Sequence, residues 1–346
     1  MRIGFIGTGR IFDKHIQAIK SLDGIELIGV HDTNVDTSKY ICQKYRLQNF
    51  TCATSLIKES DIISILTDSG DHFYSAMLAV EHGKNVIVEK PLCLTMPDCI
   101  DLVNKAEENG VRLFTVKQNR YNDEILRAKS TLDRGDLGEL FLVTSRVRWC
   151  RKSDYYSQAP WRGTWLKDGG VLTNQAIHYV DLMSLFLGPI DRVSAFAGTF
   201  NSDIEAEDTI VLNLLAASGS LGTLEATTGV RPENMEGSLS LIGTKGSIVI
   251  GGHALNRMEY FVDHKETALP NQNVNSDVYG NGHLKFYQSI LDALYTGKYH
   301  ELEGYTGAKS VSIVNAAYES VQKSVIVKLN NNYQSSPLEK AKRAMK

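Results

Sequence analysis

The stretch R-I-G-F-I-G-T-G-R-I-F, residues 2–12, sets the pattern for the first half of the chain. Its apolar part, Arg2 to Gly7, predicts a short buried strand, and the residues that follow predict a helix. Gly7 and Gly9 would permit a tight turn that lets backbone N–H groups approach a pyrophosphate. The fingerprint G-x-G-x-x-G is matched only in part, because Phe12 stands at the third glycine position. The residues expected to line such a site are Gly7, Thr8, Gly9, Arg10 and Ile11.

A second strand and the acid at its end support the same interpretation. The apolar run Ile25–Val30 leads to Asp32, which lies 25 positions after Gly7, close to the spacing of about 20 expected in a dinucleotide-binding unit. A carboxylate there would bind ribose hydroxyls and repel a 2′-phosphate, and no arginine follows in the next few positions. We therefore expect NAD rather than NADP. The competing interpretation is that Asp32 is an ordinary turn or capping residue.

Strand and helix patterns alternate as far as residue 116, which predicts a parallel, doubly wound sheet. The predicted strands are 61–66, 86–88 and 111–116, and the predicted helices are 35–45, 72–82 and 97–109. Ligands of such sheets bind beyond the carboxyl ends of the strands. The polar residues expected around that crevice are Thr67, Ser69, His72, Glu89, Lys90 and Asn119. His72 is explained equally well as a residue that begins a helix.

The tripeptide Glu89-Lys90-Pro91 directly follows the predicted strand 86–88. A lysine at the end of a strand, beside a proline that restricts the chain, is a candidate catalytic group. Taken alone the motif is weak, because most lysines are solvated surface residues. Its importance depends on the neighbours that the fold supplies.

The second half begins with a helical pattern over 122–138 and continues with consecutive strands joined by short turns. The predicted strands are 140–149, 193–200, 208–216, 220–228, 238–242 and 247–250. This order predicts an antiparallel sheet. We therefore expect an α/β Rossmann dinucleotide-binding domain over 1–121 and an α+β domain with an open, mostly antiparallel sheet over 122–346. The sheet face would suit a homodimer or homotetramer. Helices are predicted over 284–296 and 304–323, and the tail from residue 330 is expected to be loosely held.

Length and composition fit two globular domains and exclude several classes of protein. The 346 residues exceed one compact core, and a net charge of −3 gives no general attraction to nucleic acid or an anionic membrane. The five cysteines form no C-x-x-C pair, so we expect free thiols and no metal. No apolar run reaches the ~18–20 residues of a membrane helix. A strand that begins at Arg2 leaves no room for a signal peptide, so we expect a cytoplasmic protein.

Residues 148–165 contain all three tryptophans of the chain, interleaved with arginines and tyrosines. Packing explains the tryptophans but not the cations among them. Arginines beside aromatic rings suit a ligand that carries a ring together with phosphate or carboxylate groups. A purely structural plug is the competing interpretation. The residues expected to grip the substrate here are Arg148, Arg151, Tyr155, Tyr156 and Arg162.

The stretch Val171–Leu187 predicts a helix that carries Asn174, His178 and Asp181. Their spacings of four and three would place the three side chains on one helix face. Histidine is the usual base for a hydroxyl proton, and Asp181, one turn on, could orient its imidazole. Judged from this helix alone, a histidine hydrogen-bonded inside a helix interface is the simpler interpretation.

Together these residues resemble the glucose–fructose oxidoreductase/inositol dehydrogenase/rhizopine catabolism (Gfo/Idh/MocA) family over nearly the whole chain. The resemblance rests on Gly7-Thr8-Gly9, Asp32, Glu89-Lys90-Pro91 and the helix with His178. It implies a Rossmann domain joined to an open-sheet domain, and hydride transfer between a sugar carbon and a nicotinamide. It also implies that Lys90 is the active-site lysine and His178 the acid/base histidine. Many members carry aspartate where this chain has Asn174, so His178 is expected to act with Lys90.

Within that family, several stretches resemble the UDP-N-acetyl-2-amino-2-deoxyglucuronate 3-dehydrogenases. These stretches are 155–156, 161–165, 168–170, 174–178, 231–236, 251–252 and 279–283. The resemblance implies NAD-dependent oxidation at C3 of UDP-N-acetyl-D-glucosaminuronate in lipopolysaccharide sugar biosynthesis, with Asn174 among the substrate-binding residues. Its NADH could remain bound and be reoxidised by 2-oxoglutarate. The alternatives are another sugar or polyol dehydrogenase of the inositol type, and a non-catalytic NAD-binding regulator. The presence of both Lys90 and His178 argues against the regulator.

Overall fold

The computed structural model describes residues 1–263, 267–268, 282–330 and 333–345. The chain divides into two compact units. The first comprises Met1–Lys117 with His283–Ala308, and the second comprises Gln118–Gly282 with Lys309–Lys346. The boundary expected from the sequence falls after residue 121 and assigns all later residues to the second domain. The structure differs in residues 118–121, which belong to the second unit, and in the segment 283–308, which returns to the first unit.

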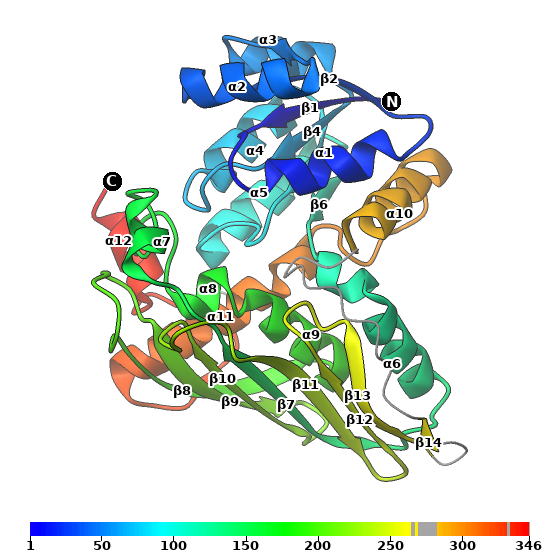
Figure 1. Cartoon of the computed structure of the whole chain (residues 1–346), viewed down its shortest axis with the longest axis vertical. Coiled ribbons are helices and arrows are strands. Elements are labelled where there is room, and N and C mark those ends of the chain that lie inside the picture. The colour runs from blue at the N-terminus through cyan, green and yellow to red at the C-terminus, as the bar shows by residue number, and fades with distance from the viewer. Residues whose placement is uncertain (264–266, 269–281, 331–332, 346) are drawn as a thin grey trace. The chain divides into compact units, whose positions relative to one another are not determined.

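The first unit contains a six-stranded parallel sheet in the order β3-β2-β1-β4-β5-β6 (Figure 1). Its strands are β1 Arg2–Ile6, β2 Glu26–His31, β3 Gln48–Asn49, β4 Ile62–Ile65, β5 Asn85–Val88 and β6 Leu113–Thr115. β4 is buried along its whole length, as expected for a strand covered on both faces. The predicted Rossmann sheet is confirmed. Of its six strands, only the edge strand β3 was not predicted, and its two residues are exposed.

The first unit also contains six helices among its described residues, and all but α3, which was not predicted, begin close to the predicted residues. They are α1 Phe12–Lys20, α2 Val35–Tyr45, α3 Ala53–Glu59, α4 His72–Glu81, α5 Met96–Glu108 and α10 Gly282–Thr296. Asn34 begins α2, since its Oδ1 accepts a hydrogen bond of 3.0 Å from the backbone N–H of Thr37. A side-chain cap of this kind satisfies an N–H group that the helix itself leaves without an acceptor.

The returning segment 283–308 is attached along the edge strand β6. The backbone N–H of Thr115 donates to the carbonyl of Leu302 at 3.1 Å. Arg112, just before β6, donates through Nε and Nη2 to the two carboxylate oxygens of Glu303, at 2.8 and 2.5 Å. Bidentate arginine–carboxylate pairs are among the stronger polar contacts in proteins. The ion pair therefore holds the returning chain against the first unit.

The second unit contains a nine-stranded sheet in the order β14-β13-β12-β11-β7-β10-β9-β8-β15. Its strands are β7 Leu140–Arg148, β8 Ile190–Gly198, β9 Thr209–Ala216, β10 Leu221–Thr227, β11 Glu236–Gly243, β12 Ser247–Gly251, β13 Arg257–Val262, β14 Thr267–Ala268 and β15 Val327–Lys328. β10 runs parallel to β7, and all other neighbouring pairs are antiparallel. The predicted open, mostly antiparallel sheet is confirmed.

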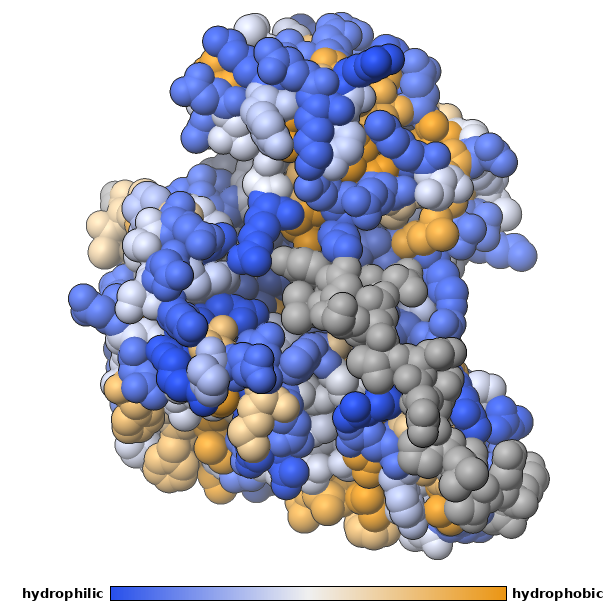
Figure 2. Space-filling view, viewed as in Figure 1, coloured by the Kyte–Doolittle hydropathy of each residue, from blue (hydrophilic) through white to orange (hydrophobic). Residues whose placement is uncertain are grey.

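Helices lie over one face of this sheet (Figure 1). The helices of the second unit are η1 Gln118–Tyr121, α6 Asp123–Asp133, α7 Ser153–Ser157, α8 Val171–Asn174, α9 Ile177–Leu187, α12 Pro337–Arg343 and most of α11 Tyr305–Lys323, whose first four residues belong to the first unit. Burial alternates along β7, where Val147 is buried and Arg146 is exposed, as expected for a sheet with one packed face. Figure 2 shows apolar surface at the lower margin, where Figure 1 places this sheet. No helix in the described residues is long and apolar enough to cross a membrane.

The C-terminal tail is packed, which corrects the expectation of a loose end for residues 333–345. Tyr333 and Leu338 are both fully buried. The hydroxyl groups of Tyr333 and Ser312 lie 2.7 Å apart. These contacts hold the tail on the second unit.

Candidate active site

The glycine-rich loop connects β1 to α1 in the first unit. Gly7 has φ of +96°, and a Cβ atom there would come within 2.5 Å of the carbonyl carbon of Leu66. A Cβ atom at Gly9 would meet no heavy atom within 4 Å. Gly7 is thus required by the backbone packed beside it, whereas Gly9 leaves open space near the start of α1. That open space, together with the exposed Gly9 and Arg10 and Ile11 at the N-cap, fits the pyrophosphate of a dinucleotide. Thr8 itself is buried.

Asp32 lies directly after β2 and binds this loop. Its Oδ2 accepts hydrogen bonds from the backbone N–H and the Oγ1 of Thr8, both at 2.7 Å. Its Oδ1 accepts from the backbone N–H of Asn34 at 2.8 Å. The side-chain cap of α2 is Asn34, so Asp32 is not a simple helix cap. A carboxylate offers about four acceptor positions, which leaves capacity for ribose hydroxyls.

Phe12, at the third position of the fingerprint, is the first residue of α1 and is fully buried. Its ring meets Phe5 of β1 edge to face at a centroid distance of 5.4 Å, and Tyr45 of α2 at 6.0 Å. An aromatic cluster therefore fills the contact between helix and strand that a third glycine would otherwise make close.

His72, predicted at the crevice, connects two of its loops instead of facing a ligand. Its Nδ1 lies 2.7 Å from the carbonyl oxygen of Pro91, and its Nε2 lies 3.2 Å from that of Thr67. Burial lowers the pKa of His72, so the ring is neutral and carries a single N–H group. The shorter contact indicates that Nδ1 carries this proton and donates to Pro91. Both nitrogens thus face backbone carbonyls, which favours the structural interpretation. Thr67 and Ser69 are half-buried in the loop after β4.

Glu89 and Lys90 differ in burial after β5. Glu89 is buried, and its Oε1 lies 2.9 Å from Nε2 of His15 on α1. Its Oε2 accepts a hydrogen bond of 3.1 Å from the backbone N–H of Lys90. The Glu89 side chain is thus engaged within the first unit, and its expected part in cofactor binding stays a prediction. Lys90 is half-buried and remains the candidate catalytic member of the motif.

Asn119 lies on η1 in the second unit and is buried. Its Oδ1 has no hydrogen-bond partner among the residues that the structure describes, and neither has Oε1 of Gln118. Leaving a buried acceptor unsatisfied costs about 1–3 kcal/mol. The amide of Asn119 therefore suits a bound polar group.

The helix predicted over 171–187 is interrupted, so Asn174 and His178 do not share one regular helix. α8 ends at Asn174 and α9 begins at Ile177. The backbone N–H of Ala176 reaches back to the carbonyl of Val171 at 2.8 Å, a wider turn than the α-helical one. The same-face argument for Asn174 was therefore wrong. Its Nδ2 donates to Oδ1 of the buried Asp168 at 2.5 Å.

His178 is the half-buried second residue of α9, a helix whose other side chains are mostly buried and apolar. Asp181, one turn further on, is buried and forms an ion pair with Arg120 of η1. Its Oδ2 and Oδ1 accept from Nε and Nη2 of Arg120 at 2.7 and 2.8 Å. This partner of Asp181 was not foreseen, because it lies 61 positions away in the sequence.

The start of α8 is held by Glu207, a residue that no sequence motif indicated. The backbone N–H of Leu172 and the hydroxyl of Tyr318 both donate to its Oε1 at 2.9 Å. Burial raises the pKa of Glu207 to about 8, in spite of these hydrogen bonds. The acid is therefore mostly protonated near neutral pH, and it lies at the base of the α8–α9 segment that carries Asn174 and His178.

Two arginines enclose Tyr155 of α7 in the second unit. The guanidinium carbons of Arg151 and Arg162 lie 5.2 and 4.3 Å from the centre of its ring. Arg162 also donates to the carbonyl of Tyr155 at 2.6 Å. Neither arginine forms an ion pair with a carboxylate in the described part of the chain. Tyr156 packs edge to face on Tyr155, and its hydroxyl lies 3.0 Å from Oγ1 of Thr228.

Arg148 does not belong to this arrangement, and its expected part in substrate binding stays a prediction. It aligns with Thr227 of β10 and Glu236 of β11 on the sheet face opposite to buried Val147. Its guanidinium pairs with Glu236 at 3.0 Å and also with Glu225. Its charge is thus balanced on the open face of the sheet, away from the face that α9 covers.

Two family descriptions match the chain. Residues 1–117 match the oxidoreductase family with an NAD-binding Rossmann fold, and residues 125–249 match the GFO/IDH/MocA C-terminal domain. The WlbA dehydrogenase from Bordetella pertussis, solved with NADH and UDP-GlcNAcA, is 32% identical, with a TM-score of 0.88 over 96% of this chain and 99% of that one. The WlbA dehydrogenase from Chromobacterium violaceum, in complex with the same two molecules, is 32% identical, with a TM-score of 0.87 over 96% and 97%.

A curated relative points to another substrate. An inositol 2-dehydrogenase from Gluconacetobacter diazotrophicus is 31% identical over 152 residues, which cover 42% of this chain and 45% of that protein. The chain thus spans about half the length of this relative. The chain belongs to the GFO/IDH/MocA oxidoreductase family. The predictions of a dehydrogenase class and of NAD as cofactor are confirmed at the level of that family. Residues 279–281, part of one stretch that resembles the subgroup, lie outside the described residues.

Proposed function

We propose that this chain oxidises a ring hydroxyl of a UDP-linked sugar acid, at C3 of UDP-N-acetyl-D-glucosaminuronate. The observation that carries the proposal is the stack of Arg151, Tyr155 and Arg162, whose two cations have no carboxylate partner in the described residues. A diphosphate or a uronate carboxylate would supply the missing negative charge. Similarity to WlbA dehydrogenases solved with UDP-GlcNAcA supports the same substrate class. The step would serve the synthesis of lipopolysaccharide sugars.

The first unit would hold the cofactor through its glycine-rich loop and Asp32. The open space at Gly9 accepts the pyrophosphate, and Asp32 accepts hydrogen bonds from the ribose. Bound NAD supplies the acceptor for the hydride. Asp32 would also disfavour NADP, because its carboxylate repels a 2′-phosphate.

His178 takes the hydroxyl proton in this proposal, and Lys90 donates a hydrogen bond to the same oxygen. A general base is worth ~10²- to 10⁴-fold in rate, and a cation beside the oxygen stabilises the negative charge that develops there. Asn174 cannot accept a proton as an aspartate would, and its amide already donates to Asp168. The acid–base work therefore falls to His178, while Asn174 binds substrate.

A second candidate is oxidation of a free polyol such as inositol. The similarity to an inositol 2-dehydrogenase favours it. Such a substrate carries no charge and would leave the cations of Arg151 and Arg162 without a function. We therefore place it second.

Turnover of the two substrates separates the candidates. We expect UDP-N-acetyl-D-glucosaminuronate, but not myo-inositol, to reduce NAD, followed through the absorbance of NADH. The assay is run in single and multiple turnover, with and without 2-oxoglutarate, since NADH that stays bound would limit the multiple-turnover signal. Absence of NADH formation in single turnover, with the bound cofactor checked to be oxidised, would exclude the nucleotide sugar. Reduction by myo-inositol alone would favour the second candidate.

The two proposed catalytic residues are tested by Lys90→Ala and His178→Ala. Both variants should bind NAD as the wild type does and lose at least ~100-fold in kcat. Lys105→Ala is the matched control, because Lys105 lies on α5 in an exposed pair with Glu108. Wild-type turnover in either variant would remove that residue from the mechanism.

The open face of the nine-stranded sheet is proposed to join copies of this chain into a homodimer or homotetramer. Its exposed apolar side chains include Phe196, Val211, Leu221 and Tyr260. A monomer rarely leaves an extended apolar face in water. Phe196→Glu should shift the assembly toward monomer in sedimentation velocity, whereas Tyr40→Glu on α2, another exposed aromatic position, should not. A wild-type monomer at high concentration would refute the proposal.

A further inference from the structure

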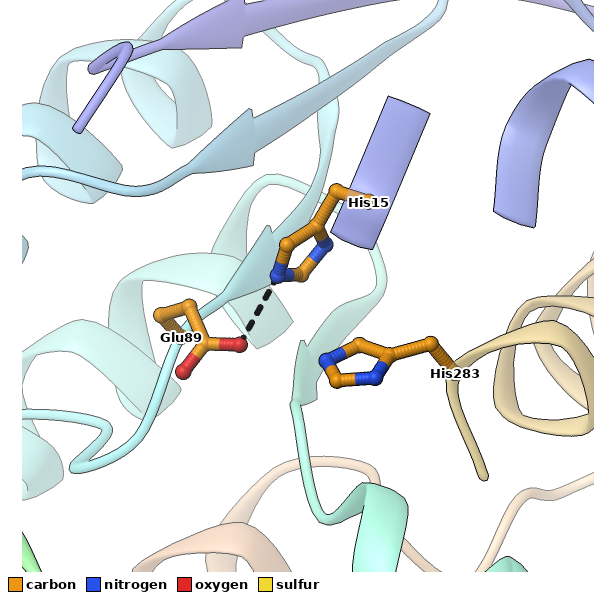
Figure 3. A group of neighbouring side chains, drawn as sticks. All are labelled: His15, Glu89 and His283. Carbon is orange, nitrogen blue, oxygen red and sulfur yellow. Dashed lines mark hydrogen bonds and ion pairs between the residues drawn. The ribbon is translucent and has the colours of Figure 1, made fainter. Parts of the chain in front are cut away.

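Three buried side chains of the first unit point toward one another (Figure 3). His15 comes from α1, Glu89 follows β5, and His283 lies at the start of α10. The nitrogen and oxygen atoms that they could offer to a cation all lie within 4.8 Å of one another. The rings of His15 and His283 meet edge to face with centroids 5.0 Å apart. Such a group suits either a metal ion or a network of hydrogen bonds.

The hydrogen bonds of His15 argue for the network. Burial alone would raise the pKa of Glu89, but the hydrogen bond from His15 and the charges of His15, Lys90 and His283 lower it to about 2. An ionised carboxylate can only accept, so Nε2 of His15, 2.9 Å from Oε1 of Glu89, carries a proton and donates it. Nδ1 of His15 lies 2.7 Å from the hydroxyl of Tyr287. Neither nitrogen of His15 has a lone pair left for a metal.

The carboxylate of Glu89 faces titratable groups on each surrounding element. They are His15 on α1, His72 on α4, Lys90 in the following loop, and His283 and Tyr287 on α10. Through Oε2 the carboxylate also accepts from the backbone N–H of Lys90 at 3.1 Å. It therefore holds the main chain of Lys90 in place and attracts a positive charge on its side chain.

We propose that His15 and Glu89 form a positioning dyad for Lys90, which fixes its main chain and keeps its side chain in the ammonium form during turnover. This inference rests on the proposed function, in which the Lys90 ammonium group stabilises the reacting oxygen. Tyr287, on the returning helix α10, fixes the ring of His15 through the contact between its hydroxyl group and Nδ1. His15 and Glu89 touch neither substrate nor cofactor in this proposal.

The test replaces Glu89 by glutamine, which removes the charge and keeps a side chain of similar shape. The protonation of Lys90 is read by pH-dependent acetylation of the NAD-bound protein, quantified at this residue by mass spectrometry, because only the free amine reacts. The midpoint for Lys90 should move about one pH unit lower in Glu89→Gln, since an adjacent opposite charge stabilises an ion by about that much. The basic limb of the pH profile of kcat should move with it. Glu108→Gln, an exposed acid on α5, should change neither.

A second pair of variants distinguishes loss of the His15–Glu89 contact from a folding defect. His15→Leu should lower kcat at least about tenfold with unchanged NAD affinity, and His15→Gln, which keeps an N–H donor toward Glu89, should restore most of it. An unchanged acetylation midpoint of Lys90, in Glu89→Gln protein that folds and binds NAD, would overturn the proposal. A metal ion that the wild type binds in a 1:1 ratio and that His15→Leu loses would overturn it too. The acetylation readout needs no substrate. A shifted midpoint without turnover of any sugar would therefore support the dyad and refute the proposed function.

Discussion

Replacing Glu207 by glutamine removes a buried acid whose affinity for a proton depends on folding. The carboxyl group accepts hydrogen bonds from Leu172 and Tyr318, but burial still raises its pKa from 4.5 to about 8. In the unfolded chain the same group is solvated and has its ordinary pKa. The native state therefore holds a proton over a range of pH in which the unfolded chain releases it.

This difference makes the second unit lose stability as the pH rises. Below pH 4.5 both states hold the proton, and the stabilising contribution is fully present. It declines between pH 4.5 and about 8, because only the unfolded state is ionised there. Each pH unit corresponds to about 1.4 kcal/mol, so the loss amounts to roughly 5 kcal/mol over the 3.5 units that separate the two pKa values.

Glutamine is neutral at every pH and should abolish this pH dependence of stability. We expect the free energy of unfolding of Glu207→Gln, relative to wild type, to rise by about 4 kcal/mol between pH 5 and pH 9. Urea unfolding followed by tryptophan fluorescence measures it, because all three tryptophans of the chain lie in the second unit. Glu205→Gln is the control, an exposed acid two residues away. A difference between Glu207→Gln and wild type that stays within about 1 kcal/mol over this range would refute the reasoning.

Three further predictions concern the first unit, and the last of them has a control variant in the second unit. Asp32→Ser should improve kcat/KM for NADP relative to NAD by about tenfold or more in steady-state assays, because the repelling carboxylate is gone. Gly7→Ala should lower the melting temperature, whereas Gly9→Ala should leave it unchanged and weaken NAD binding in calorimetry. Arg112→Met should lower the free energy of unfolding by about 2–4 kcal/mol, since a half-buried carboxylate loses its partner. Lys129→Met, in a more exposed pair, should change it by less than ~1 kcal/mol.

Much of the fold followed from local patterns. The alternation of apolar runs and helical periods predicted the parallel sheet of the first unit, and the short turns after residue 138 predicted the antiparallel sheet of the second. These signals are carried by neighbouring residues, since the period of burial is a property of each strand or helix. The interruption between α8 and α9 escaped, because every residue of that stretch is compatible with a helix and only the hydrogen bond from Ala176 to Val171 reveals the wider turn.

Positions on the two faces of the sheet were harder to predict. Arg148 stands beside the aromatic stretch in the sequence, yet it pairs with Glu225 and Glu236 on the open face. Successive side chains of a strand point to opposite faces of the sheet. A shift of one residue along the strand therefore moves a side chain from the packed face to the open one. The sequence pattern around Arg148 contains cations and aromatic residues on both faces and does not show which arginines share a ligand.

By itself, the sequence determined the two fold classes, the glycine-rich loop with Asp32, and Glu89-Lys90-Pro91 as the centre of interest, because these depend on contiguous residues. Only the tertiary structure decided the partners of those residues. Tyr287 lies 272 positions from His15 and reaches it because the chain returns to the first unit at residue 283. Glu89 lies inward against His15, and Lys90 is the half-buried residue of the motif. A hydrogen bond depends on which atoms folding brings within about 3 Å, whatever their separation along the chain.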